Sequence, residues 1–354
     1  MFNFLKGIFP RKIIGVDIGT FSIKIIEISQ WGRFKKLKNY SEVPLKSIIK
    51  EPLLEQKGGG TFISPGTLSL ALREGLDEAG IKTKAVIFSI PDFLTFSTSF
   101  EIPPMPEKEI AGAIQYNAAQ YVTLPISEVT VDWRIIPNNS SSKILTKVLI
   151  VAIPNQVVQD YKTIAKEARL ELYAIEPEIF GLNRAFTQKS QKVVCLVDIG
   201  MQSSTVNIID KGFLKKSYSI TPNTKQLTQE LSSVLGFNEQ QVEEIKSKEG
   251  FNSSNQAMRN SLLSFADSLM KEIKGIVDEF YRFEQKMVDE VYLTGGTANM
   301  PGLKGHIGQG IGKPIFVPYC FSELLYPKIL KGALQEINPR FSVAVGVALD
   351  GLEI

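Results

Sequence analysis

A duplicated segment constrains this chain more than any other feature. Val16-Asp17-Ile18-Gly19 and Val197-Asp198-Ile199-Gly200 have the same sequence. Each copy lies between β-rich runs, which is the pattern of a strand, a tight glycine turn and a second strand. The two aspartates lie roughly 180 positions apart, far more than the period of a solenoid repeat. The duplication therefore predicts two similar lobes.

A third glycine turn lies nearer the C-terminal end. Gly295-Gly296-Thr297 follows the apolar run VYLT and precedes a helical pattern. In this arrangement backbone N–H groups can face an anion, or a flat ring can lie close to the chain. Each of the three turns alone could be an ordinary β-turn. All three in this order predict one site that clamps a polyphosphate between two lobes.

The residues around the first two turns suit a phosphate and a metal ion. Gly19 has no β-carbon, so backbone N–H groups can approach a phosphate oxygen. Lys24 in the next strand can supply a point charge, and Asp17 at the strand end can hold the water molecules of a Mg²⁺ ion. The second turn offers the same groups from the opposite side: Asp198, Gly200, Ser203, Ser204 and Thr205.

The composition narrows the classes of function. Of 354 residues, 44% are hydrophobic and 22% are charged, and a net charge of +3 is too small to indicate nucleic acid binding. The single histidine, His306, excludes a multi-histidine metal site. Cys195 and Cys320 lack a pairing motif, which favours a reducing compartment. No apolar run reaches the roughly 18 residues that a membrane span needs, so we expect a cytoplasmic protein.

Two features near the N-terminus concern surfaces. The basic run Arg33, Lys35, Lys36 and Lys38 is typical of a solvated loop, with contact to an anionic surface as the alternative. The segment MFNFLKGIF could form an apolar helical face that touches a membrane. Nine residues make a marginal helix, however, so an arm packed on the protein or a disordered end is an equal alternative.

The remaining pattern predicts an α/β chain with an insertion. Helical spacing predicts helices at 67–79, 224–235, 238–248 and 254–286, and an apolar run predicts a buried strand at 85–91. Between 93 and 172 the order strand, helix, strand, strand, helix predicts a small α+β module, after which the repeat resumes. A small-residue helix is expected at 338–352.

The three motifs VDIG, VDIG and LTGG resemble the phosphate 1, phosphate 2 and adenosine motifs of the actin, Hsp70 and sugar-kinase superfamily, over nearly the whole chain. The resemblance implies an α/β, two-lobed actin/Hsp70-like ATPase fold that binds ATP and Mg²⁺. It assigns the phosphates to Asp17, Gly19, Thr20, Lys24, Asp198, Gly200 and Ser203, and the nucleoside to Gly295, Gly296 and Thr297. Asp17 and Asp198 would hold Mg²⁺ through water.

A further pair extends this resemblance. Glu243 and Lys246 lie one helical turn apart on one face. In the superfamily a Glu-x-x-Lys helix of the second lobe often touches ribose and base, which implies a cofactor-binding role for both residues. An ordinary surface ion pair is the alternative.

The insertion narrows the family. IGVDIGTFSIKIIEI, Ile102-Pro103 before EKEIAGAIQYNAAQYV, Leu124-Pro125 and VYLTGGTANMPGLKGHI resemble the type IV pilus assembly protein PilM family more closely than the cell-division protein FtsA. FtsA typically ends in a membrane-targeting amphipathic helix, whereas this sequence stops at Leu352-Glu353-Ile354, which favours PilM.

The PilM resemblance implies an ATP-binding cytoplasmic adaptor. It would dock the cytoplasmic N-terminal peptide of an inner-membrane PilN-like protein and act within the pilus assembly ATPase complex. We therefore expect a location at the inner face of the cytoplasmic membrane through partners, with indirect membrane contact and homo-oligomers possible. The implied divisions are 1–92 (first lobe, 1A), 93–172 (SHS2-like α+β subdomain, 1C), 173–190 (connecting helix), 191–337 (second lobe, 2A/2B) and 338–354 (closing helix).

Two departures from the pattern concern hydrolysis. Asn223-Thr224 stands where the family usually has a glycine pair. Members that hydrolyse ATP place a Gln or Glu before phosphate 2 to orient water, and here Glu176 and Glu178 are both candidates. We expect weak or absent ATPase activity and assign no catalytic residue. The alternatives are an FtsA-like filament protein, or a sugar-kinase-type phosphotransferase using Asp132.

Overall fold

The computed structural model describes residues 11–45, 63–136 and 145–353. The N-terminal segment considered above as a membrane contact lies outside them. The strands are β1 (Arg11–Ile18), β2 (Ser22–Trp31), β3 (Phe34–Pro44), β4 (Ala85–Ile90), β5 (Phe96–Ile102), β6 (Val129–Ile136), β7 (Thr146–Pro154), β8 (Glu171–Pro177), β9 (Val193–Ile199), β10 (Ser204–Asp210), β11 (Phe213–Ile220), β12 (Glu290–Thr294), β13 (Ile315–Phe316) and β14 (Leu324–Leu325).

The α-helices are α1 (Pro65–Glu78), α2 (Glu107–Tyr121), α3 (Asn155–Glu167), α4 (Glu178–Phe186), α5 (Thr224–Leu235), α6 (Glu239–Lys248), α7 (Gln256–Glu284), α8 (Leu303–Ile311), α9 (Lys331–Ile337) and α10 (Ser342–Glu353). Short 3₁₀ turns include η3 (Asp92–Leu94), η6 (Lys328–Leu330) and η7 (Asn338–Phe341). The helices predicted from periodicity at 67–79, 224–235, 238–248 and 254–286 are confirmed within two residues at each end.

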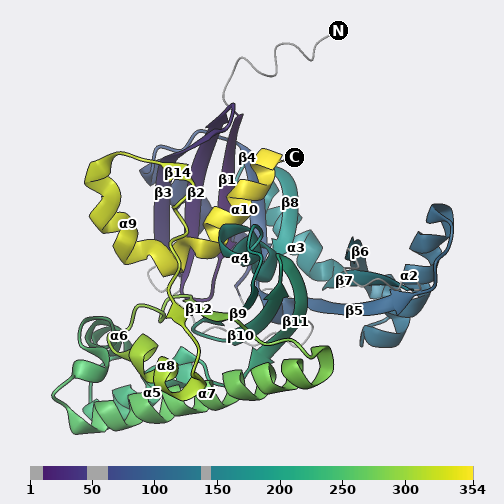
Figure 1. Cartoon of the computed structure of the whole chain (residues 1–354). Coiled ribbons are helices and arrows are strands. Elements are labelled where there is room, and N and C mark those ends of the chain that lie inside the picture. The colour runs from purple at the N-terminus through teal and green to yellow at the C-terminus, as the bar shows by residue number, and fades with distance from the viewer. Residues whose placement is uncertain (1–10, 46–62, 137–144, 354) are drawn as a thin grey trace.

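Two sheets carry the duplicated segments, one above the other in Figure 1. The first has the order β14-β3-β2-β1-β4-β8 and the second β11-β10-β9-β12-β13. In the first, β1 pairs antiparallel with β2 and parallel with β4, and in the second β9 pairs in the same way with β10 and β12. The sequence repeat is therefore also a repeat of topology, and it predicts the two lobes correctly.

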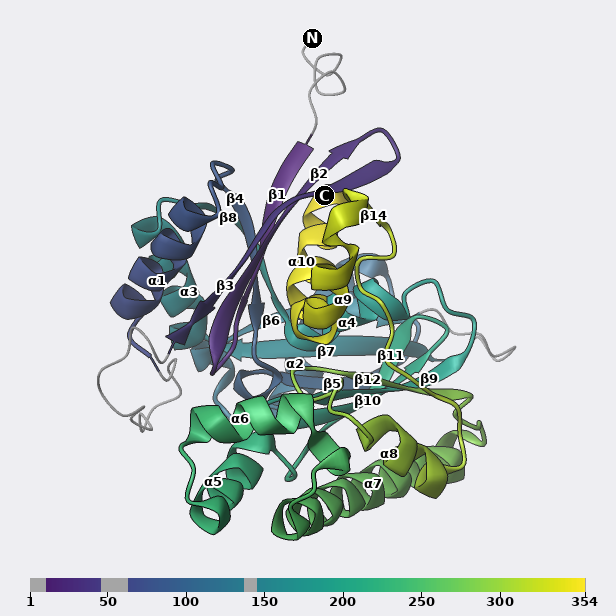
Figure 2. The ribbon, with the colours of Figure 1, turned by 90° about the vertical axis from the view of Figure 1, so that its left-hand side faces the viewer.

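Helices cover each sheet according to its alternating pattern of buried residues. On the first sheet, α1 and α3 pack on one face and α4 and α10 on the other (Figure 2). On the second sheet, α5, α7 and α8 bury the outer face. The cluster around α4 and α10 also includes Leu196 and Ile209 of the second sheet, so it packs between the lobes.

The closing helix α10 contacts its neighbours at backbone distance. A β-carbon at Gly346 would lie 1.9 Å from the carbonyl oxygen of Gly181 in α4, and one at Gly15 would lie 2.2 Å from that of Ala344. Glycine is therefore required where α10 crosses both α4 and β1. The two helices that connect the lobes thus pack directly on each other beside the first sheet.

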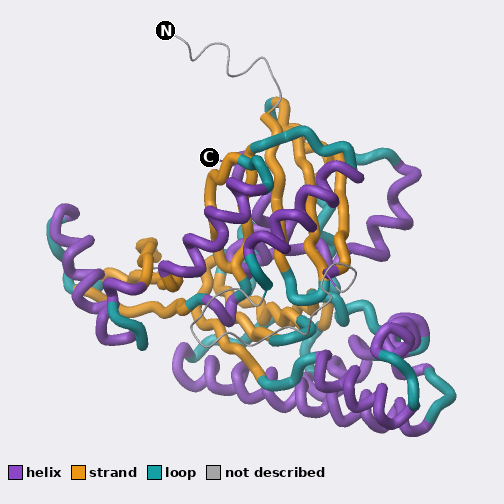
Figure 3. Tube along the Cα trace, turned by 180° about the vertical axis from the view of Figure 1, so that it is seen from behind, coloured by secondary structure: helices purple, strands orange, loops and turns teal. Residues whose placement is uncertain are grey.

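A third sheet, with the order β5-β7-β6, carries the inserted module, which projects to one side of the molecule in Figures 1 and 3. Helix α2 packs on it around Ile114, Ala118, Val148 and Ile150. By contrast, α3 packs on α1 within the core of the first lobe. The segment 93–172, expected to form one subdomain, thus ends with a helix that the first lobe buries.

None of the helices in the described part of the chain combines the length and apolar character that crossing a membrane requires.

Candidate nucleotide-binding site

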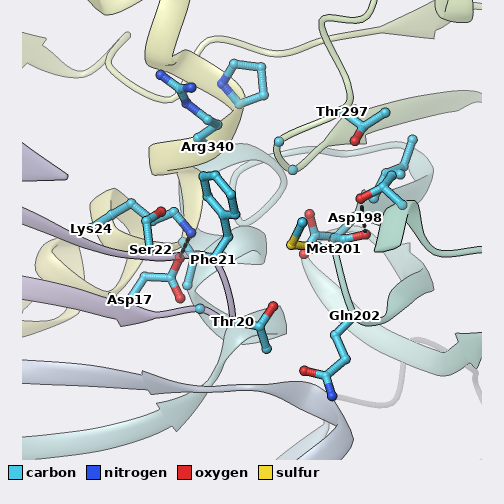
Figure 4. Close-up of a pocket in the computed structure, with 18 of the residues that line it drawn as sticks. Asp17, Thr20, Phe21, Ser22, Lys24, Asp198, Met201, Gln202, Thr297 and Arg340 are labelled. Carbon is cyan, nitrogen blue, oxygen red and sulfur yellow. Dashed lines mark hydrogen bonds and ion pairs between the residues drawn. The ribbon is translucent and has the colours of Figure 1, made fainter. Parts of the chain in front are cut away.

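A cavity of about 740 Å³ lies where the three glycine turns meet (Figure 4). Its walls come from the ends of β1, β9 and β12, from α6, and from the segment before α10. Of the twelve residues predicted to bind cofactor, eleven line it: Asp17, Gly19, Thr20, Lys24, Asp198, Gly200, Ser203, Glu243, Gly295, Gly296 and Thr297. Only Lys246 does not.

The first turn holds a buried lysine and aspartate side by side. Asp17 pairs with Lys24 across the β1–β2 register, and the Lys24 ammonium donates to its carboxylate at 3.2 Å. The hydroxyl of Ser89 donates to the other Asp17 oxygen at 3.0 Å. Burial alone would lower the pKa of Lys24, but the facing carboxylates of Asp17 and Glu42 raise it overall. Lys24 therefore stays cationic in the cavity.

Glycine is needed at this turn for access. A β-carbon at Gly19 would lie 2.9 Å from the Lys24 ammonium nitrogen. Any larger residue would therefore push the ammonium from its place beside the turn.

The second turn is joined to the N-terminus of α5. The backbone N–H and the hydroxyl of Thr224 both donate to the Gly200 carbonyl, at 3.3 and 3.2 Å. The side chain of Asn223 caps α5 by accepting from the backbone N–H of Gln226. The two residues that depart from the family's glycine pair thus form a helix cap that holds the turn.

Several carboxylates converge on this cavity. Burial, with Asp17 nearby, raises the pKa of Asp198 to about 6. Burial, with Asp17, Asp92 and Asp198 nearby, raises the pKa of Glu178 well above its usual range. The pKa of Asp92 rises to about 7, mainly through burial. The site therefore holds more acidic groups than Lys24 alone can neutralise.

Glu178 lines the cavity at the start of α4. Its carboxylate accepts from the N–H of Asp92 at 3.4 Å, while the Asp92 carboxylate accepts from the N–H of Ile179 at 3.2 Å. Glu176, the other glutamate of this segment, instead forms a two-pronged bond with Arg184, at 2.7 and 3.1 Å. From the sequence, both glutamates were candidates for the residue that orients water. In the structure Glu178 lies at the cavity, whereas Glu176 binds Arg184 of α4.

The third turn fits closely against the second. Gly295 has φ +89°, and a β-carbon there would lie 2.5 Å from both Asp198 Oδ1 and the Ile199 carbonyl oxygen. The nearest atom to a β-carbon at Gly296 would be a carbon of Arg340 at 4.0 Å. Gly295 is therefore needed for packing, whereas Gly296 leaves its part of the cavity wall without a side chain.

The Glu243–Lys246 pair divides its roles. The Lys246 side chain is 3% exposed, and its ammonium donates to Glu243 and to the Thr228 hydroxyl, both at 2.8 Å. Burial lowers the pKa of Lys246, with Glu243 opposing that shift. Only Glu243 reaches the cavity. Lys246 lies behind it and joins α6 to α5.

Arg340 was not found by sequence reasoning. It lines the cavity near Phe21 and Gly296 (Figure 4) and pairs with Glu42 at 3.5 Å. Its Nε atom is buried without a hydrogen-bond partner among the described residues. No sequence motif surrounds Arg340; only the fold, which brings η7 beside the third turn, places it there.

These carboxylates do not form a ready metal site by themselves. Among the described residues, no group of three or more His, Cys, Asp or Glu side chains is placed to hold a metal ion. A cation here would need further ligands from water or from a bound phosphate, and the assignment of Asp17 and Asp198 as its ligands through water stays a prediction.

Comparisons with known proteins support the fold. One chain of a PilM-PilN type IV pilus biogenesis complex superposes with a TM-score of 0.84 at 22% identity, covering 97% of this chain and 99% of that one. The ethanolamine utilization protein EutJ from Carboxydothermus hydrogenoformans gives 0.55 at 16%, covering 97% and 91%. MreB 5 of Spiroplasma citri bound to AMPPNP gives 0.50 at 13%, covering 92% and 97%. The predicted two-lobed actin-like fold with an inserted subdomain is confirmed.

The family follows from the sequence match. The family model of the type IV pilus assembly protein PilM matches residues 15–352, which is nearly the whole chain. The chain therefore belongs to the type IV pilus assembly protein PilM family.

Proposed function

We propose that the chain is an ATP-binding adaptor of type IV pilus machinery, which docks the cytoplasmic N-terminal peptide of a PilN-like inner-membrane protein. The observation that carries this proposal is the cavity at which two duplicated turns and a third glycine turn meet, in a chain of the PilM family. A similar solved chain comes from a PilM-PilN complex, and another similar structure holds the nucleotide analogue AMPPNP.

The cavity suits a nucleotide that carries its own cation. Lys24 can face a phosphate oxygen, as can backbone N–H groups of the turns. The carboxylates of Asp17 and Asp198 would repel a bare triphosphate, so a divalent cation is needed to offset them. Bound Mg²⁺ would neutralise phosphate charge, held through water by Asp17 and Asp198. Gly296, Thr297 and Arg340 would border the nucleoside.

Slow hydrolysis fits the same geometry. Of the two glutamates considered for this role, Glu178 is the one that could correspond to the Gln or Glu that orients the attacking water in relatives that hydrolyse ATP. Its raised pKa favours the protonated form, in which it cannot accept a proton from water. We infer that ATP serves as a structural or switching ligand, with weak or absent turnover.

Calorimetric titration of Mg-ATP tests the site. Asp17→Ala and Asp198→Ala should each weaken binding at least tenfold, about 1.4 kcal/mol. Asp132→Ala is the matched control, because Asp132 is exposed on β6 and does not line the cavity. Full affinity in both cavity variants would exclude the phosphate clamp.

The inserted module is the proposed peptide dock, with the first lobe as the second wall. Strand β6 lies at the edge of its sheet among the described strands, and Trp133 and Ile135 are exposed on it. A free strand edge with apolar side chains beside it suits an extended or short helical peptide. Because a disordered tail loses entropy on binding, we expect affinity of the order of micromolar.

Fluorescence polarisation with a labelled PilN-type N-terminal peptide tests the dock. Trp133→Ala combined with Ile135→Ala should weaken binding at least about tenfold, while Phe283→Ala, an exposed aromatic on α7, should not. Equal affinity in all three proteins would place the dock elsewhere. Deleting the whole range 93–172 is a poorer test, because it removes α3 from the core of the first lobe.

This role places the protein at the inner face of the cytoplasmic membrane, within the pilus assembly ATPase complex and held there by its partner. Homo-oligomers are compatible with it. Sedimentation with and without Mg-ATP tests that point, since an adaptor that acts alone stays monomeric in both.

A further inference from the structure

An uncovered face lies at the end of the first sheet farthest from the cavity. Leu37 and Leu324 are buried on the face beneath α9 and α10. Side chains alternate along a strand, so Lys36 and Leu325, which pair across β3 and β14, point to the opposite face. Phe34 lies two residues before Lys36, and Trp31 pairs with Phe34, so the side chains of Phe34 and Trp31 point to this opposite face as well. We call these four residues the hairpin tip face.

This face is apolar at its centre. Trp31 is 70% exposed, Phe34 57% and Leu325 55%, and Ile329 on the adjoining η6 turn is 90% exposed. Further along the same strands α1 and α3 cover the sheet, but no described helix reaches the tip (Figure 2). Large apolar side chains gathered on one uncovered face usually mark a contact surface.

Cations surround the apolar centre. Arg33, Lys36, Lys38 and Lys328 are exposed, and Arg11 and Lys12 begin β1 beside the hairpin. The Arg33 guanidinium lies 5.3 Å from the centre of the Phe34 ring. Neither 28–41 nor 324–335 contains an acidic residue, and the neighbouring Glu323 is already paired with Lys35 and Lys189. The face therefore carries an excess of positive charge.

We propose that the hairpin tip face binds the surface of an anionic lipid membrane directly. Tryptophan settles at the level of the lipid headgroups, and both tryptophan and phenylalanine on a basic surface bury their rings at the boundary between headgroups and acyl chains. Arginine and lysine around them meet lipid phosphates, each strengthening attachment about fivefold near an anionic surface. An acidic protein segment would satisfy the cations but would leave Trp31, Phe34, Leu325 and Ile329 in water, so the lipid surface fits better.

The proposal departs from the expectation that membrane contact is only indirect. Of the two interpretations of the basic run, a solvated loop and contact with an anionic surface, it favours the second. Lys35, Lys36 and Lys38 lie in strand β3 and not in a loop. Lys36 belongs to the hairpin tip face, whereas Lys35 points to the other face and pairs with Glu323. The proposal does not depend on the nucleotide or on the peptide dock.

Co-sedimentation of the full chain with vesicles tests it. We expect binding to vesicles of phosphatidylcholine mixed with phosphatidylglycerol, and none to phosphatidylcholine alone. Arg33→Glu with Lys36→Glu should lower the affinity at least about tenfold. Trp31→Ser with Phe34→Ser should lower it as well. All four side chains are exposed, so neither double variant should unfold the chain.

Matched controls lie on α7, where Lys271, Lys274 and Phe283 are also exposed. Lys271→Glu with Lys274→Glu, and Phe283→Ser, should bind like the wild type. In a Trp133→Phe background, Trp31 is the remaining tryptophan, and its emission should shift to the blue on anionic vesicles. Absence of wild-type binding, or equal binding by the tip variants and the controls, would overturn the proposal.

Discussion

The contact between the second and third turns gives a sharp prediction at Gly295. Alanine there would hold a left-handed backbone, which costs about 1–2 kcal/mol. Its β-carbon would also lie 2.5 Å from both Asp198 Oδ1 and the Ile199 carbonyl oxygen, and such overpacking costs about 1–3 kcal/mol more. Gly295→Ala should therefore lower the free energy of unfolding by about 2–5 kcal/mol.

Gly296→Ala is the matched control for stability. A β-carbon at Gly296 has only Arg340 nearby, at 4.0 Å, so the free energy of unfolding should change by less than about 0.5 kcal/mol. If the nucleoside lies against Gly296, this variant should still bind Mg-ATP more weakly. The pair thus separates a residue needed for packing from one needed for binding.

Urea denaturation and calorimetric titration of Mg-ATP are the assays. A double-mutant cycle of Gly295→Ala with Asp198→Ala should give a coupling energy of at least about 0.5 kcal/mol, because the second change removes one of the clashing atoms. Wild-type stability in Gly295→Ala would refute the packing argument. Equal destabilisation by Gly295→Ala and Gly296→Ala would refute the distinction between the two glycines.

Three further predictions concern the ion pair that holds α4, two buried carboxyl groups and the rate of ATP turnover. Arg184→Met leaves Glu176 buried without its partner and should lower the free energy of unfolding by about 3–5 kcal/mol. Adding Glu176→Gln should restore most of this loss. The midpoints of urea denaturation measure both changes. The folded-state pKa values of Asp198 (about 6) and Asp92 (about 7) lie above their unfolded values, so their stabilisation is complete below about pH 4 and is lost as pH rises toward 7. Asp92→Asn should flatten the decline in urea midpoints. Steady-state ATP turnover, measured as phosphate release, should stay below about 1 s⁻¹.

Sequence alone predicts the three turns well because their rules are local. An aspartate at the strand end with glycine two residues later indicates each of the first two turns, and a glycine pair directly after a strand indicates the third. The duplication then predicts two lobes, and the order of the turns predicts that they share one cavity. The helices follow from apolar spacing, and the structure adds the asparagine caps at Asn223 and Asn238.

What sequence could not predict depends on packing between distant segments. Arg340 reaches the cavity because η7 lies beside the third turn, and Glu178 reaches it because α4 packs on α10. The Glu-x-x-Lys spacing predicted that Lys246 lies on the same face of its helix as Glu243. Only the contact between α5 and α6 shows that Lys246 is buried against Thr228. The lysines of β3 favoured a loop in the sequence analysis, because lysine is depleted in strands in general.

The module touches both lobes, which bounds how strongly nucleotide can control a docked peptide. Helix α3 anchors the module's end to the first lobe, whereas β5 lies beside β11 of the second and Lys147 pairs with Glu284 of α7 at 3.8 Å. Nucleotide that draws the lobes together acts on the module through this second contact. A partly exposed ion pair contributes about 0–1 kcal/mol, and a ligand shifts a conformational equilibrium only by its differential affinity. Coupling through this ion pair alone should therefore change peptide affinity by no more than about fivefold.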